Sequence, residues 1–209
     1  MSLYIPPHFE APDSDAIIGL IQAYPFATLV SVVDGEPLIT HLPLVADENG
    51  LLLGHVARAN PHAEALEDGA TVTAIFHGPH AYVSPTWYAK PNVPTWNYAT
   101  VHVKATVRPL EDPEIVHALL DGLIATFDDE EAAGETPQMT HEAREALFGH
   151  IHCFALEIED IEAKFKLSQN RSAADQKRVV AALGQREDDN ARELVSLMLH
   201  NLRQTASQK

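Results

Sequence analysis

The sequence has one cysteine, Cys153, and no long apolar run in 209 residues. A single thiol cannot form a disulfide within the chain, which suits a reducing compartment. No stretch approaches the roughly 20 apolar residues that a membrane-spanning helix needs. The first residues, MSLYIPP, lack a basic leader and an apolar stretch followed by small residues, so no secretory signal is expected. We therefore expect a cytoplasmic protein without a membrane segment.

Basic residues are scarce in most of the chain. Lys and Arg total 14 against 30 Asp and Glu, which gives a formal net charge of −16. Residues 1–163 hold five basic and twenty-five acidic residues, a net of −20, whereas residues 164–209 hold nine and five, a net of +4. DNA binding depends on cations that neutralise phosphates, so the acidic segment opposes it. The basic segment predicts either an anion-binding tail or a tail that docks on the acidic body of its own or a partner subunit.

Several signatures of catalytic and metal sites are missing. The sequence contains no G-x-G-x-x-G, Walker loop, G-x-S-x-G or H-E-x-x-H. A Rossmann or P-loop nucleotide site is therefore not expected, and no nucleophile can be named. Twelve histidines are present, with His77-x-x-His80 and His150-x-His152 as the closest pairs, but a Cys/His array is missing. We expect no metal site and assign no catalytic residue.

The order of the expected elements indicates antiparallel strands with inserted and appended helices. Asp34-Gly35 and Asn49-Gly50 separate runs rich in β-branched residues, which is typical of hairpins. Asn60-Pro61 and Asp112-Pro113 each combine a capping side chain with a proline of the first helical turn. Strands are expected at 26–33, 37–46, 51–57, 71–76, 80–84, 95–109 and 152–161, helices at 14–23, 60–68, 112–127 and 140–148, two further helices from 173 broken near residue 184, and an acidic loop at 128–137.

This order fits an α+β protein built on an antiparallel, Greek-key-like β-barrel, with peripheral and C-terminal helices. Alternating βαβ units with a parallel sheet are not indicated. We assign residues 1–163 to the barrel domain and residues 164–209 to a basic connector followed by C-terminal helices packed on the barrel.

Residues 54–61, GHVARANP, end one strand and begin a helix. Arg58 and the free N–H groups of that helix would lie together, which is an arrangement that holds a phosphate by charge and helix dipole. Arg58 is also the only basic residue among the first 89. The alternative is that Asn60 and Pro61 only cap a helix and that Arg58 is a surface charge.

Three further segments carry polar or aromatic groups that a planar cofactor such as a flavin would use. Thr40 and His41 interrupt an apolar strand and need partners if they are buried; the partners are a ring edge, a backbone group or water. Trp87, Tyr88, Trp96 and Tyr98 either stack on a cofactor or pack in a core or dimer interface. Residues 164–171, KFKLSQNR, either bind a phosphate or an acidic surface or form an exposed connector.

Taken together, seven segments resemble the PaiB-like family of FMN-binding negative transcriptional regulators. They are YIPPHF (4–9), PFAT (25–28), THLP (40–43), GHVARANP (54–61), GPHAYVSP (78–85), VPTWNY (93–98) and KFKLSQNR (164–171). The match runs from about residue 3 to 185 in the expected order. The resemblance implies an FMN-binding split β-barrel, a homodimer with FMN near the subunit interface, and repression of genes such as those for proteases and sporulation.

The resemblance also implies which residues contact FMN. In related flavin split barrels, basic and hydroxyl residues at a strand-to-helix junction hold the phosphate, and the ring lies against the backbone of a neighbouring strand. Carried onto this sequence, that pattern implies Arg58 and Asn60 at the phosphate, and Thr40, His41 and Leu42 at the ring. The remaining implied contacts, of which the first three come from the same or the other subunit, are Thr95, Trp96, Asn97, Lys164, Lys166, Ser168 and Gln169.

Three functions are compatible with this resemblance. The first is a flavin-bound regulator that represses transcription; direct DNA contact would have to use residues 164–186, which hold six basic residues and one acidic residue. The second is an FMN-dependent oxidoreductase or flavin reductase, in which the cofactor moves the electrons. The third is a module that stores or senses FMN or haem.

Overall fold

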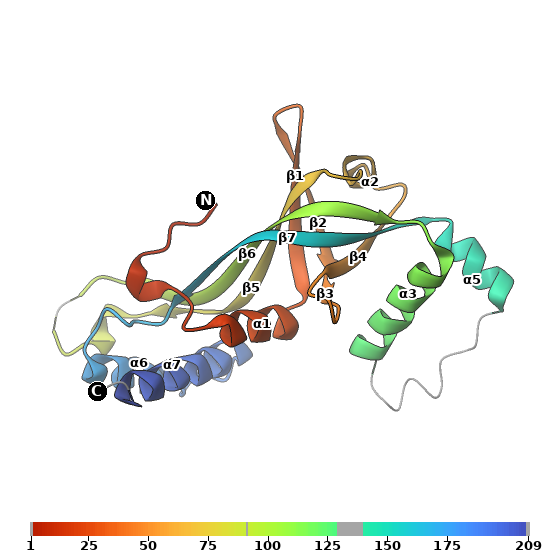
Figure 1. Cartoon of the computed structure of the whole chain (residues 1–209). Helices are drawn as coiled ribbons and strands as arrows, with labels where there is room; N and C mark the ends of the chain where they lie inside the picture. Colours follow the sequence, from red (N-terminus) through yellow and green to blue (C-terminus); the bar gives the residue numbers. More distant parts are fainter. Residues whose placement is uncertain (1, 91, 129–139, 208–209) are drawn as a thin grey trace. The chain divides into compact units, whose positions relative to one another are not determined.

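The computed structural model describes residues 2–90, 92–128 and 140–207 (Figure 1). Its helices, with short 3-10 turns written η, are η1 Pro7–Phe9, α1 Ser14–Ala23, α2 His62–Ala65, η2 Pro85–Trp87, α3 Pro113–Phe127, α5 His141–Phe148, α6 Ala173–Leu183 and α7 Asp189–Ser207. Its strands are β1 Phe26–Val33, β2 Glu36–Pro43, β3 Val45–Ala46, β4 Leu52–Ala57, β5 Thr71–Val83, β6 Thr95–Leu110 and β7 Ile151–Lys166. Of the acidic loop expected at 128–137, residues 129–137 lie outside the described residues.

Most elements lie where the sequence predicts them, but several boundaries differ. The strand expected at 37–46 is divided into β2 and β3, and the helix expected at 60–68 is only the short α2, His62–Ala65. The strands expected at 71–76 and 80–84 are one strand, β5, and the last strand continues beyond Ile161 to Lys166. Gly78 and Pro79, which lie between the two expected strands, are buried inside β5. A Cβ at Gly78 would lie 2.8 Å from Leu20 Cδ1 and 3.0 Å from the Ala99 carbonyl oxygen. This glycine therefore permits a close approach within the strand and does not mark a turn.

The seven strands form one sheet in the order β2-β1-β5-β6-β7-β4-β3. The pairings of β1 with β2 and β5, and of β4 with β3 and β7, are antiparallel. β2 stands at one end of this order and β4 next to the other end, yet β2 and β4 contact each other. In unit 2 the barrel is therefore closed by packing between β2 and β4, which are not neighbours in the hydrogen-bonded order, so the outer edge of β2 keeps an unpaired backbone.

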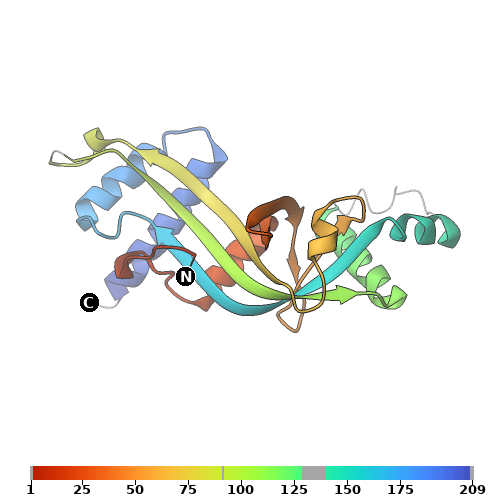
Figure 2. The ribbon, with the colours of Figure 1, turned by 90° about the horizontal axis from the view of Figure 1, so that it is seen from above.

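Contacts divide the chain into two compact units, each built from separate segments. Unit 1 comprises Met1–Tyr24, Phe76–His102 and Glu162–Lys209, and unit 2 comprises Pro25–Ile75 and Val103–Ile161. The long strands β5, β6 and β7 lie side by side and contribute residues to both units (Figure 2). The division at residue 163 that the charge distribution suggested stays a prediction.

The core of unit 2 is packed tightly around Gly54 on β4. Leu42, Leu44 and Phe154 surround it, and none of these three side chains is more than 4% exposed. A Cβ at Gly54 would lie 2.6 Å from Leu44 Cδ2 and 3.4 Å from both Leu42 Cδ1 and Phe154 Cζ. Because side chains in a core are already close-packed, no larger residue fits here without displacing Leu44.

A buried imidazole fastens α2 to the barrel. His62 Nε2 lies 2.8 Å from Ser31 Oγ on β1, and His62 Nδ1 lies 2.9 Å from Thr40 Oγ1 on β2. Asn60 Nδ2 donates to the same Thr40 hydroxyl at 3.2 Å, and Asn60 Oδ1 accepts from the His62 N–H at 3.0 Å. His62 is 1% exposed, and burial lowers the pKa of its imidazole. This network connects the residues after β4 to β1 and β2 without leaving a ring nitrogen unbonded.

In unit 1, the two faces of β6 carry different partners. Asn97 Nδ2 lies 3.6 Å from Met198 Sδ of α7, whereas the ring of Tyr98 lies 5.6 Å from Lys164 Nζ of β7. Neighbouring residues of a strand point to opposite faces, so α7 covers the Asn97 face of β6 and Lys164 of β7 lies on the Tyr98 face. Leu20 places α1 on the covered side, beside Ala99 and Gly78.

The packing at Gly54 predicts opposite effects for two glycine substitutions. Gly54→Ala should lower the free energy of unfolding by about 1–3 kcal/mol, because the added methyl group overfills the core. Gly122→Ala on α3 should raise it by up to about 1 kcal/mol, because a Cβ there meets no described atom within 4 Å and alanine favours the helix. Denaturant unfolding measures both values. If Gly54→Ala were as stable as the parent protein, the packing account would be wrong.

The neutral state of His62 predicts a loss of stability in acid. Burial lowers the pKa of His62 in the folded protein, and it also lowers the pKa of His55 and His102. The unfolded chain, whose histidines have ordinary pKa values of about 6.5, therefore binds protons first as the pH falls. The free energy of unfolding should be nearly constant above about pH 7 and should decrease from about pH 6.5 downward.

Two variants test whether His62 contributes to that pH dependence. His62→Gln should cost about 1–3 kcal/mol at pH 7.5 because buried hydroxyl groups lose a partner, and its stability should then depend less on pH between 7.5 and 5. His8→Gln, at an exposed position, should keep the dependence of the parent protein. If the free energy of unfolding depended on pH equally in His62→Gln and in the parent protein, the pKa of His62 would not differ between the folded and the unfolded state.

Candidate functional site

Arg58 stands directly after β4, at the junction that His62 fastens. Its backbone N–H donates to the His150 carbonyl oxygen at 2.8 Å, while its side chain is exposed. Among the described residues, no hydrogen bond or ion pair holds the guanidinium. It borders a cavity of about 330 Å³ that Glu111 and Cys153 also line. Arg58 is therefore a cation that remains available for a ligand.

The other two basic side chains described in unit 2 are paired with carboxylates. Arg108 donates to Asp68 Oδ1 at 3.0 Å and to Glu157 Oε2 at 2.8 Å. Lys104 donates to Glu159 Oε2 at 2.6 Å. Exposed pairs of this kind contribute little to stability, but they show that acidic partners are within reach of most cations in this unit. The unpaired state of Arg58 is an exception.

The three candidates on β2 differ in what they can offer. Thr40 is half-buried and bonded to His62 and Asn60, so its hydroxyl already has protein partners. His41 is exposed, with Nδ1 3.1 Å from Thr28 Oγ1. Leu42 is buried in the barrel core and can contact a ligand only through its backbone. β2 stands at one end of the hydrogen-bonded order of the sheet. The backbone groups on its outer edge are therefore not paired with another strand.

Three cations come together in unit 1. Lys164 Nζ donates to the Tyr4 carbonyl oxygen at 2.7 Å and lies 5.4 Å from the centre of the Tyr4 ring. Lys166 Nζ donates to Thr95 Oγ1, so a hydroxyl is its partner. The Arg171 guanidinium lies 5.3 Å over the ring of Tyr88.

Lys166 carries the clearest electrostatic signal of this group. The pKa of its ammonium is lowered by burial first and then by the positive charges of Lys164 and Arg171. No carboxylate pairs with Lys166 among the described side chains. A half-buried ammonium without a counterion beside two other cations favours the binding of an anion.

The remaining candidates in unit 1 form a rigid turn after β7. Asn97 Nδ2 donates to Ser168 Oγ at 2.9 Å, and Ser168 has a left-handed backbone with φ of 68°. Gln169 Oε1 accepts from the Leu167 N–H at 2.7 Å, and its Nε2 donates to the Phe165 carbonyl oxygen. The buried side chains of Asn97 and Ser168 are therefore structural, and they hold the end of the cationic strand in place.

The aromatic cluster separates into buried and exposed members. Trp96 is 53% exposed and lies near Tyr82 and His80, with ring centroids 6.1 Å and 6.2 Å away. Trp96 and His80 border a cavity of about 440 Å³ on this face of β5 and β6. Tyr88, in contrast, is buried, and its hydroxyl has no hydrogen-bond partner among the described residues. Trp87 and Tyr98 are half-buried, so Trp96 is the most exposed of the four aromatic side chains in this cluster.

Contacts thus assemble the twelve sequence candidates into separate groups. Thr40 and Asn60 are joined in unit 2, and Thr95 with Lys166 and Asn97 with Ser168 are joined in unit 1. His62 was missed by the sequence reasoning, although it follows Asn60-Pro61 directly. A histidine just inside a capped helix signals a buried hydrogen-bond role only when the neighbouring strands are known.

These groups fit the parts of FMN. Its phosphate needs uncompensated cations such as Arg58 and Lys166, and its ring needs an exposed flat surface such as Trp96. No group of three or more described His, Cys, Asp or Glu side chains could hold a metal ion. Within the described ranges, no helix is long and apolar enough to cross a membrane.

Comparison with known proteins identifies the family. A family model described as "Putative FMN-binding domain" matches residues 3–160. The "Protease synthase and sporulation protein PAI 2" of Bacillus subtilis is 34% identical over 208 residues, which cover 96% of this chain and 99% of that protein.

Two solved structures share the fold. The FAD and heme binding protein of Mycobacterium smegmatis aligns with a TM-score of 0.61 and 20% identity, covering 82% of this chain and 78% of that one. The flavocytochrome Anf3 of Azotobacter vinelandii aligns with a TM-score of 0.60 and 15% identity, covering 74% and 68%. The split β-barrel expected from the sequence is confirmed. The chain belongs to the PaiB-like family of FMN-binding proteins, and FMN is its cofactor.

Proposed function

We propose that Arg58 holds the phosphate of FMN and that the flavoprotein acts as a negative regulator of transcription, as the resemblance to PaiB-type regulators implies. One observation carries the proposal: Arg58 has no partner among the described residues of an acidic unit, in which Arg108 and Lys104 are both paired. A guanidinium matches a phosphate with two parallel hydrogen bonds, which makes this cation well suited to the role.

The chain's own residues bind and orient the cofactor in this proposal. The His62 network holds Asn60 and Thr40, and therefore the backbone before α2 from which Arg58 projects. His41 and the outer backbone of β2 are proposed to contact the ring. When bound, FMN supplies the capacity to accept and return electrons.

We propose a cytoplasmic homodimer in which unit 1 of the partner subunit contributes to FMN binding. The exposed Trp96 and Tyr82 form an aromatic surface of the kind that interfaces bury. The Lys166 cluster, with Thr95 as its hydroxyl neighbour, supplies further positive charge for the phosphate or for an acidic partner surface.

Loss of the free guanidinium should weaken FMN retention. The purified protein should be yellow and should release FMN on denaturation, and Arg58→Ala should raise the Kd for FMN by about 10- to 100-fold, because a charge-assisted hydrogen bond contributes about 1.5–3 kcal/mol. Fluorescence quenching of added FMN measures the Kd.

Arg108→Ala is the matched control, because it removes an arginine that is already paired. It should leave the Kd for FMN unchanged. Lys166→Met, compared with the exposed Lys177→Met, reports the contribution of the cluster in unit 1. Unchanged FMN affinity in Arg58→Ala would refute the assignment of Arg58 to the phosphate. If only Lys166→Met lost affinity for FMN, the phosphate contact would belong to unit 1.

Direct repression requires a cationic DNA-binding surface, which we place on α6. Lys177 and Arg178 are exposed there, within the segment of six basic residues and one acidic residue. Binding to promoter DNA should weaken as salt rises, and the double variant Lys177→Ala, Arg178→Ala should reduce the salt slope by about 2. Electrophoretic mobility shifts at several salt concentrations measure it. DNA binding that is absent, or independent of salt, would contradict a direct contact.

A further inference from the structure

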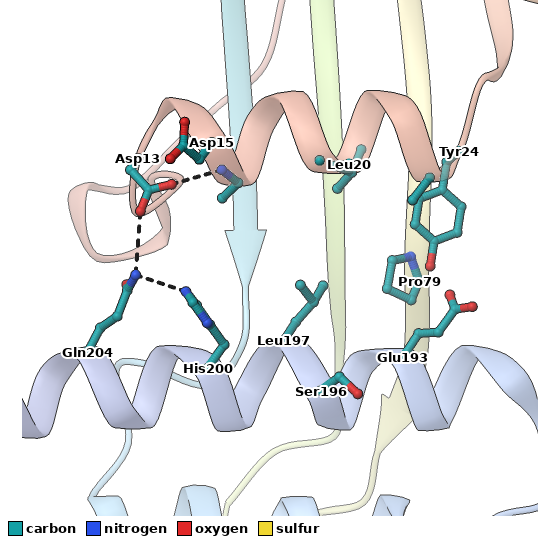
Figure 3. Close-up of a pocket in the computed structure, with 13 residues that line it drawn as sticks. Asp13, Asp15, Leu20, Tyr24, Pro79, Glu193, Ser196, Leu197, His200 and Gln204 are labelled. Carbon is teal, nitrogen blue, oxygen red and sulfur yellow. Dashed lines mark hydrogen bonds between the residues drawn. The ribbon is translucent and has the colours of Figure 1, made fainter.

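A groove between α1 and α7 shares no residue with the proposed FMN contacts. Its volume is about 640 Å³, which lies within the range of small-molecule pockets, about 300–1,000 Å³. Figure 3 shows the two helices running alongside each other, with Leu20 of α1 and Leu197 of α7 projecting into the gap. Ala16, Gly19 and Ala23 also line it, so its floor is apolar.

The charged groups of the groove are acidic. Asp13, Asp15 and Glu193 line it, together with His200, but Lys and Arg do not. Asp13 is used by the protein itself, because it accepts from the Ala16 N–H at 2.8 Å and from Gln204 Nε2 at 3.4 Å. Asp15 and Glu193 have no hydrogen bond or ion pair with any residue that the structure describes. An apolar floor beside unpaired carboxylates is complementary to an organic cation.

Gly19 gives an independent indication that the groove is kept open. It lies inside α1, where glycine costs about 1 kcal/mol relative to alanine. A Cβ at Gly19 would meet nothing within 4 Å among the described atoms, and its backbone is not in the left-handed region. Neither packing nor backbone geometry therefore requires glycine here. The missing side chain leaves space that a ligand can use.

The two ends of the groove differ. At one end, Gln204 Nε2 lies 2.9 Å from His200 Nε2 within α7 and donates to Asp13 Oδ2 at 3.4 Å, so one hydrogen bond links the start of α1 to α7 (Figure 3). At the other end, Figure 3 shows Glu193 and Tyr24 directed into the gap near Pro79. A carboxylate beside an aromatic ring stabilises an ammonium by charge and by cation–π attraction.

We propose that this groove binds a hydrophobic organic cation, an aryl- or alkylammonium compound. The apolar body lies on Leu20, Leu197 and the open surface at Gly19. The ammonium group lies at the end formed by Glu193 and Tyr24. Such a ligand would brace α7 against α1 in unit 1, which makes the groove a site for a small-molecule signal.

Three compounds of one shape test the proposal on the full-length protein loaded with FMN. These are 4-phenylbutylamine, 4-phenylbutanol and 4-phenylbutyrate at pH 7.5, with binding measured by isothermal titration calorimetry. The amine should bind at least threefold more tightly than the alcohol, because a partly exposed charge pair contributes up to about fivefold, and the butyrate should bind most weakly. Equal affinities for the three compounds would overturn the preference for a cation.

Variants locate the binding. Glu193→Gln should remove the advantage of the amine over the alcohol, whereas Glu187→Gln, outside the groove, should keep it. Gly19→Leu should fill the groove and weaken all binding more than tenfold. An FMN content and a thermal unfolding temperature equal to those of the parent protein would show that the Gly19→Leu variant remains folded. Binding that survives in Gly19→Leu, or no binding of the amine to the parent protein, would overturn the groove as the site.

Discussion

Closure of the antiparallel sheet between β2 and β4 is the constraint on which the rest of unit 2 depends. The two strands can approach only because Gly54 leaves room for the buried Leu44. Their contact brings Thr40 of β2 within hydrogen-bond distance of Asn60 and His62, which follow β4. Core packing thus positions the junction from which Arg58 projects. The guanidinium of Arg58 is exposed and is not required to hold the junction in place.

The basic side chains are compensated differently in the two units. In unit 2, carboxylates hold Arg108 and Lys104, and only Arg58 among the described basic side chains is without a partner. In unit 1, the positive charges of Lys164, Lys166 and Arg171 lie close enough to affect one another. Arg58 in unit 2 and the cations around Lys166 in unit 1 are thus two places at which positive charge favours an anion.

The two faces of β6 separate two kinds of chemistry in unit 1. One face carries Trp96 and Tyr98 beside the ammonium of Lys164, which suits an anionic, planar cofactor. The other face packs on α1 and α7, between which the acidic groove lies. Because alternate residues of a strand point to opposite sides, a bound ligand on one face need not compete with a ligand on the other.

The sequence by itself determined the order of elements, the helix starts and the family. Asp13 and Asp112 cap their helices as expected, because an N-cap depends only on groups a few residues apart. Seven short motifs in the right order identified the FMN-binding family, which the comparisons confirm. Whether Gly78 marks a turn or a close approach inside β5 depends on its contact with Leu20, which lies far along the chain.

Only the tertiary structure decided which polar side chains have protein partners. Thr40, Asn60, Asn97 and Ser168 looked like ligand contacts in the sequence, but each is bonded to a residue far along the chain or across a turn. The burial of His62 and the groove between α1 and α7 likewise depend on segments more than twenty residues apart. Local patterns record what a side chain can bond to; which partner it meets depends on how the chain packs.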